Sequence, residues 1–155
     1  MSLAKPRGLM TSGFDLVGDD RLLATMEGSF WREGGSVRVG NDTWELRRQG
    51  WSTFRLVRNN LDEAVARARG FFKSTFEIDH AGRTYQLARQ SVWRRSYAVL
   101  EAGVEVGSIE PTSAWTNAAA VRLPDSMPLQ LQVFIVGVVA IQWRRAQSAS
   151  VSSTT

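Results

Sequence analysis

The chain has no cysteine and only one histidine, His80, among its 155 residues. The absence of cysteine excludes disulfide bonds, thiol nucleophiles and thiolate ligation of zinc or of iron–sulfur clusters. A single histidine excludes metal motifs that need two imidazoles. The sequence therefore predicts no metal site and no cofactor. Its 43% of apolar residues is typical of a folded chain rather than a disordered one.

Lysine is also scarce, because Lys5 and Lys73 are the only lysines and arginine supplies 17 of the 19 basic residues. Against 15 acidic residues these leave a net charge of +4 and a pI near 10.3. A nucleic-acid footprint concentrates basic residues on one stripe. Here they are spread along the chain, so nucleic acid is not the expected partner, although a weak nucleic-acid binder that uses arginine and tryptophan is one alternative.

The amino terminus lacks the apolar core of about 7 to 15 residues that a secretory signal peptide requires. We expect residues 1–20 to form a flexible leader, residues 21–146 a single domain and residues 147–155 a disordered tail. A cytoplasmic location follows from these expectations, with a peripheral position at a membrane as one option.

Between the two ends, apolar and polar residues alternate with a period of two, as in half-buried β-strands. Phe76 and Ile78 alternate with Glu77 and Asp79, and Val37 and Val39 alternate with polar neighbours in the same way. Residues suited to tight antiparallel turns separate such runs at 40–42, 81–83 and 102–103. Many short strands with closely spaced turns predict an antiparallel sandwich or barrel.

An internal repeat supports this interpretation. The sequence Thr-Trp-Glu-Leu-Arg-Arg-Gln at 43–49 recurs 41 residues later as Thr-Tyr-Gln-Leu-Ala-Arg-Gln at 84–90. Two copies are too few for a propeller, which needs at least about four blades. The repeat indicates a duplicated hairpin within one sheet, with chance similarity as the alternative.

Two segments depart from the strand pattern. Residues 60–70 predict a short surface helix, with Asn60 as the N-cap, Glu63 in a capping-box position and Gly70 as the stop. Residues 126–143 carry no charge and are almost wholly apolar. They predict a helix over about 127–145, roughly 28 Å long, with apolar side chains around its whole circumference.

The apolar helix has two interpretations. A membrane span needs about 20 predominantly apolar residues, whereas this stretch is shorter and includes Gln130, Gln132 and Gln142. A buried core helix is therefore favoured, and a closed barrel around it would give both the helix and the sheet a packing partner.

The order of these features resembles a known superfamily. Short strands precede Val-Glu-Val-Gly-Ser-Ile at 104–109, and Leu123-Pro124 leads into an apolar helix that ends in Arg144-Arg145. This arrangement, over about residues 21–146, is similar to the LURP-one-related and tubby C-terminal-like superfamily, which includes the phospholipid scramblases. The chain departs from scramblases because it has neither a proline-rich extension nor a cysteine cluster.

The resemblance implies a mainly β (α+β) fold, a closed antiparallel β-barrel of about twelve strands enclosing a hydrophobic C-terminal helix. The residue pattern at 60–70 adds the short surface helix. It also implies a non-enzymatic binding or scaffold domain, and phospholipid head groups or an acidic protein are the expected partners. A scramblase-like protein anchored by residues 126–143 is the alternative.

The candidate site residues are two arginine pairs. Arg47-Arg48 and Arg94-Arg95 follow their strands, near Trp51 and Trp93, so both pairs are expected at related ends of the barrel. Guanidinium groups suit bidentate contacts with phosphate, and indoles suit a lipid interface. The alternative is that these arginines are ordinary surface charges.

Catalytic residues are not expected in this chain. His80 is predicted in a hairpin turn, without an orienting carboxylate and a nucleophile. Glu77 and Asp79 share the outward face of a strand, so a solvated surface pair is favoured over glycoside chemistry.

Overall fold

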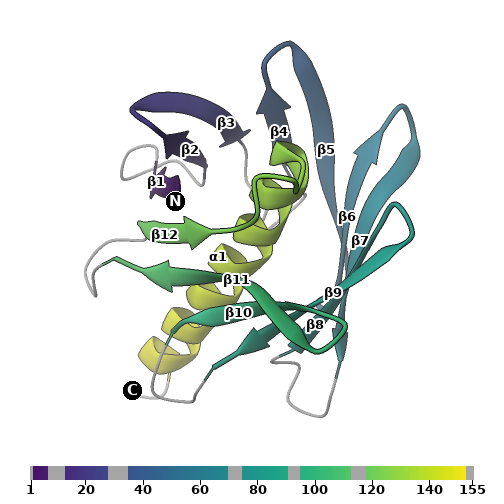
Figure 1. Ribbon diagram of the computed structural model, residues 1–155. Helices are drawn as coiled ribbons and strands as arrows, with labels where there is room; N and C mark the ends of the chain where they lie inside the picture. The colour runs from purple at the N-terminus through teal and green to yellow at the C-terminus, as the bar shows by residue number, and fades with distance from the viewer. Residues whose placement is uncertain are drawn as a thin grey trace.

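A computed structural model describes residues 2–6, 13–27, 35–69, 75–90, 95–112 and 118–152, with side chains described only as far as residue 146. Twelve antiparallel strands pair in sequence order, and β1 pairs with β12 to close the barrel. One C-terminal helix follows them (Figure 1). The elements are β1 (Ser2–Pro6), β2 (Phe14–Gly18), β3 (Arg21–Glu27), β4 (Gly35–Val39), β5 (Asp42–Gln49), β6 (Thr53–Arg58), β7 (Leu61–Arg69), β8 (Thr75–His80), β9 (Arg83–Arg89), β10 (Tyr97–Glu101), β11 (Val104–Pro111), β12 (Ala119–Arg122) and α1 (Leu129–Ser152). The prediction of a closed, mainly β barrel of about twelve strands with a C-terminal helix is confirmed.

Five two-residue turns lie together at one end of the barrel, which we call the tight-turn end. They are at 19–20, 40–41, 59–60, 81–82 and 102–103. In four of them both residues have a positive φ, the backbone of a type I′ turn, whose twist matches that of the flanking strands. At the opposite end the short connection 50–52 joins β5 to β6, and we call this the Trp51 end.

The sequence repeat coincides with two equivalent hairpins. In β4 and β5, Val37 is opposite Trp44. In β8 and β9, Ile78 is opposite Tyr85 at the same offset. All four side chains are buried, so each copy of the repeat supplies one large aromatic residue and one β-branched residue to the barrel interior.

The predicted helix over 60–70 is wrong, because residues 61–69 form β7 between β6 and β8. Asn59 and Asn60 have φ values of 54° and 62°, so Asn60 is a turn residue rather than a helix cap. Ala64 and Ala66 are buried while Arg67 is exposed, an alternation with the period of a strand. The alanine-rich composition favours a helix locally, but small side chains also fit the inner face of a closed barrel.

The predicted leader over residues 1–20 is also wrong in part. Residues 2–6 form β1, which pairs with both β2 and β12 and so completes the closed sheet. Residues 14–18 form β2, and its Phe14 and Leu16 are buried. The alternation in these two short strands was masked by the glycine, serine and aspartate around them. The barrel therefore begins at residue 2 rather than at residue 21.

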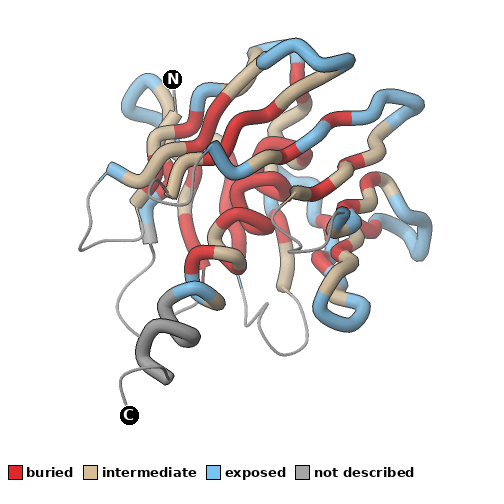
Figure 2. Tube along the Cα trace, turned by 90° about the horizontal axis from the view of Figure 1, so that it is seen from below, coloured by how far each residue is buried: buried red, intermediate tan, exposed pale blue. Residues whose placement is uncertain are grey.

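Most of the first half of helix α1 is buried. All nine residues from Leu131 to Val139 are buried (Figure 2). Seven of them, all except Gln132 and Gly137, belong to one hydrophobic cluster with inward-facing residues of the strands. A Cβ at position 137 would lie 2.8 Å from Cε of Met26, the end of a flexible side chain that would have to shift. The helix runs to Ser152, beyond its predicted end at 145 and into the predicted tail.

Hydrogen bonds from main-chain N–H groups and from the Gln132 side chain fix the start of α1. Leu131 and Gln132 donate their main-chain N–H groups to the carbonyl of Pro128, each at 3.0 Å. The buried Gln132 amide donates to the carbonyls of Met127, at 2.9 Å, and Pro124, at 3.4 Å. These bonds satisfy a polar side chain inside an apolar cluster, which would otherwise destabilise the fold.

Candidate functional site: arginines and tryptophans at the Trp51 end

Two adjacent arginines of β5 lie on opposite faces of the strand. Arg47 is on the outer face, where its Nε and Nη2 donate to one oxygen of Glu45 at 3.1 and 2.8 Å. That hydrogen bond, and then the charge of Glu45, raise the pKa of Arg47. Arg48 instead lies with its guanidinium carbon 5.6 Å from the ring centre of Trp51. The predicted pair is therefore split, and only Arg48 contributes to a surface with tryptophan.

The second predicted pair is seen in part. Arg94 and Trp93 lie outside the described residues. Arg95 lies over the indole of Trp143, 5.1 Å from the ring centre. Its main-chain carbonyl accepts the indole N–H of Trp143 at 2.6 Å. Arg95 is thereby connected to α1, a contact that strand periodicity does not predict.

Arg145 is the central residue of this end, and the sequence interpretation missed it. Its Nη1 donates to the carbonyl of Trp51 at 2.7 Å. Its guanidinium carbon lies 4.7 Å from the ring centre of Trp51 and 5.6 Å from that of Phe54. Trp51 thus has a guanidinium contact from β5 and another from α1, while 66% of its surface stays exposed. Trp143 and Arg145 each donate a hydrogen bond to a main-chain carbonyl in a connection between strands. Helix α1 is therefore held at two points.

Three buried N–H donors at the Trp51 end have no hydrogen-bond acceptor among the described residues: Nη2 of Arg95, Nη2 of Arg145 and Nε2 of Gln142. A buried donor without a partner costs about 1–3 kcal/mol, and more when the group is charged. Burial, followed by the nearby charge of Arg48, lowers the pKa of Arg145. The environment of these groups is therefore rich in donors and in positive charge.

Several arginines on the outer wall are arranged differently, because they contact a carboxylate. Arg58 lies 2.8 Å from Asp42, Arg67 lies 3.5 Å from Asp79, Arg69 lies 3.4 Å from Glu77, Arg83 lies 2.8 Å from Glu101, and Arg55 pairs with Asp62. For Arg95 and Arg145 the contacts within the described ranges are aromatic rings and a main-chain carbonyl. We define the donor surface as Arg48, Trp51, Arg95, Gln142 and Arg145.

The other predicted residues lie elsewhere. Glu77 and Asp79 are on the outer face of β8, where they pair with arginines of β7 as expected for a solvated surface. His80 is the last residue of β8 rather than a turn residue, and only 11% of its side chain is exposed. It therefore lies at the tight-turn end, away from the donor surface.

No family model, curated protein or solved structure matches this chain. Within the part of the chain that the structure describes, no helix has both the length and the apolarity needed to cross a membrane.

Proposed function

We propose that this protein is a non-enzymatic binding module whose donor surface binds an anionic group, a phosphate or a carboxylate. The barrel, closed around α1 as its hydrophobic core, acts as a fixed scaffold for that surface. The observation that carries the proposal is the set of three buried donors without acceptors around residues 142–145 and Arg95. A phospholipid head group or an acidic protein would present such an anion, and these are the two partner classes we expect.

The chemistry of the donor surface supports an anion over a neutral ligand. Arg145 already uses Nη1 to hold the carbonyl of Trp51, so its orientation is set before a ligand binds. A guanidinium held in place loses little side-chain entropy when it makes further contacts. Each hydrogen bond from a charged donor contributes about 1.5–3 kcal/mol. An anion would also offset the repulsion between Arg48 and Arg145, the interaction that helps lower the pKa of Arg145.

The exposed Trp51 supports a partner with an apolar part beside its charge. Indole rings concentrate at interfaces where one side is apolar and the other is wet. This fits the resemblance to the tubby-like superfamily, whose tubby members bind phosphoinositide head groups, and membership of that superfamily stays a prediction. Nucleic acid is a weaker candidate, because base stacking on Trp51 would need further aromatic platforms along a basic groove.

The test is a comparison of variants in binding to vesicles. Wild type and the Arg145→Gln and Arg48→Gln variants are sedimented with phosphatidylcholine vesicles that contain or lack an anionic phospholipid. We expect the wild type to bind only the anionic vesicles and each variant to lose at least about fivefold in affinity, a change of roughly 1 kcal/mol. Arg47→Gln is the matched control, since it removes the same charge from the neighbouring residue.

Two further arms separate the partner classes. Competition by a soluble acidic peptide, without vesicle binding, would assign the surface to an acidic protein. Equal loss in Arg47→Gln and Arg145→Gln, or equal competition by dextran sulfate, would contradict the proposal, because binding would then follow net charge alone. Thermal unfolding of each variant checks that its fold is retained, and Arg145→Lys tests whether charge without the planar fork is sufficient.

A further inference from the structure

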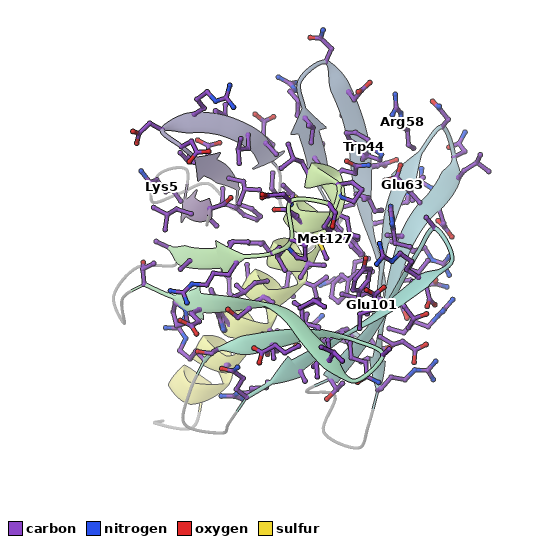
Figure 3. All side chains as sticks on the ribbon, viewed as in Figure 1. Lys5, Trp44, Arg58, Glu63, Glu101 and Met127 are labelled. Atoms are coloured by element: carbon purple, nitrogen blue, oxygen red, sulfur yellow. The ribbon has the colours of Figure 1, made fainter. Side chains whose placement is uncertain are left out.

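A second polar cluster lies at the tight-turn end, apart from the donor surface. Glu63 is the additional residue of a β-bulge in β7, because Leu56 is opposite Ala64 while Val57 is opposite Asp62. The bulge turns the Glu63 carboxyl toward Trp44, whose indole N–H donates to Oε1 at 3.0 Å. Figure 3 labels Trp44, Glu63 and Arg58, which come from three neighbouring strands. One carboxyl oxygen is thereby fixed in position.

The other oxygen of Glu63 is the unusual atom. Oε2 is buried and accepts no hydrogen bond from any described residue. Among the described residues, the basic atom within 4 Å of it is Nε2 of His80, 3.9 Å away, and 11% of the His80 side chain is exposed. This separation is too long for a hydrogen bond but within the range of an ion pair if the imidazole carries a proton. Phe76, Ile78 and His80 alternate along β8, so His80 is on the strand face of its buried neighbours.

The charged groups around His80 and Glu63 already have partners. Arg83, opposite His80 in β9, donates to both oxygens of Glu101 at 2.8 and 2.9 Å. Arg58 in β6 lies over Trp44 and binds Asp42 of β5 at 2.8 Å. Asp79, beside His80 in β8, contacts Arg67 and accepts a bond from Thr84. Oε2 of Glu63 is therefore the acceptor left for His80 among these groups.

We propose that Glu63 and His80 form a proton-dependent clasp at the tight-turn end. When His80 is protonated, Nε2 moves onto Oε2 of Glu63 and links β8 to the Trp44 contact of β5. When it is neutral, any contact between Nε2 and Oε2 lacks the attraction between opposite charges. Protonation thus favours the closed clasp, which stabilises the fold more when His80 is charged than when it is neutral.

A double-mutant cycle tests the clasp. Thermal unfolding of the wild type, His80→Gln, Glu63→Gln and the double variant is measured at about pH 5.5 and about pH 8.5, on either side of the usual imidazole transition. Glutamine at 63 keeps an oxygen for the Trp44 N–H and removes only the charge. We expect His80→Gln to lower the Tm at the acidic pH by on the order of 3 °C, and to have less than half that effect at the alkaline pH.

Some results of the double-mutant cycle would contradict the clasp. An effect of His80→Gln that is the same at both pH values, or unchanged by Glu63→Gln, would overturn the clasp. If Glu63→Gln does not fold, His80→Lys replaces it in the test. A permanent charge at position 80 should make the stability contribution independent of pH, and a retained pH dependence would count against the proposal. Because His80 is the only histidine in the chain, its imidazole NMR signals report directly on the pairing.

Discussion

Replacement of Val136 by aspartate is the sharpest test of how α1 contributes to stability. Val136 is 3% exposed, in a run of helix residues that are all buried. Removing the valine side chain from the apolar cluster forfeits about 1.5–3 kcal/mol. An unpaired carboxylate in the same place costs several kcal/mol more. Since a domain is stable by only about 5–15 kcal/mol, Val136→Asp should abolish soluble folding.

The same position allows a graded measurement. Val136→Ala removes two methyl groups and should cost about 2 kcal/mol, less the few tenths that alanine gains in helix propensity. For a chain of this size the Tm should fall by about 4–8 °C. Ala146→Asp places the same charge on an exposed position of the helix and is the matched control. The assays are the soluble fraction on expression and thermal unfolding by circular dichroism; a Tm for Val136→Asp within about 2 °C of wild type would refute this view of the core.

Two other predictions follow from single positions. Burial raises the pKa of Tyr97, and the charge of Arg89 opposes this shift. The folded state therefore favours the neutral phenol. The resulting stability is present below about pH 10 and is lost as the pH rises through the raised pKa. Tyr97→Phe should therefore lose less stability than the wild type between about pH 9 and pH 11, and parallel unfolding curves would contradict this. Asn60 has a φ of 62°, so Asn60→Val should destabilise the chain by about 1–2 kcal/mol while Asn60→Gly is nearly neutral. The measurement is the chemical denaturation midpoint, and equal midpoints for the valine and glycine variants would contradict this reasoning.

Most of the barrel could be predicted because strand period and turn residues are local signals. Each strand needs only its own alternation and the turn that follows, and the turns at 81–82 and 102–103 carry glycine at a positive φ. Strand β7 could not be predicted from these local signals. Its sequence satisfies local rules for a helix with an N-cap and a stop, yet the pairing of residues 61–69 with both β6 and β8 decides its state. Local propensity differs by only tenths of a kcal/mol per residue, so tertiary pairing prevails.

The candidate site was predictable only on its strand side. Arg48, Arg95 and Trp51 could be named because they lie near the ends of strands of the repeat or in the connections that follow them. Arg145 could not, since its partner Trp51 is 94 residues away in the chain. The period of two does separate Arg47 from Arg48, because consecutive residues of a strand face opposite sides. Applied to the predicted pair, that rule alone would have left one arginine on the outer wall, where Glu45 binds it.

The arginines at the two ends of the barrel have different contacts. We therefore expect the position of an arginine, rather than the net charge of the protein, to govern the binding of an anion. Around the outer wall and the tight-turn end, arginines such as Arg67 and Arg83 contact carboxylates. At the Trp51 end, Arg145 contacts indole and a carbonyl. A double variant Arg47→Gln with Arg67→Gln has the same net charge as Arg48→Gln with Arg145→Gln. If the donor surface is the binding site, only the second pair should lose affinity for an anion. Equal losses in the two double variants would mean that the surplus of four positive charges acts as a diffuse field, and the donor surface would then have no special role.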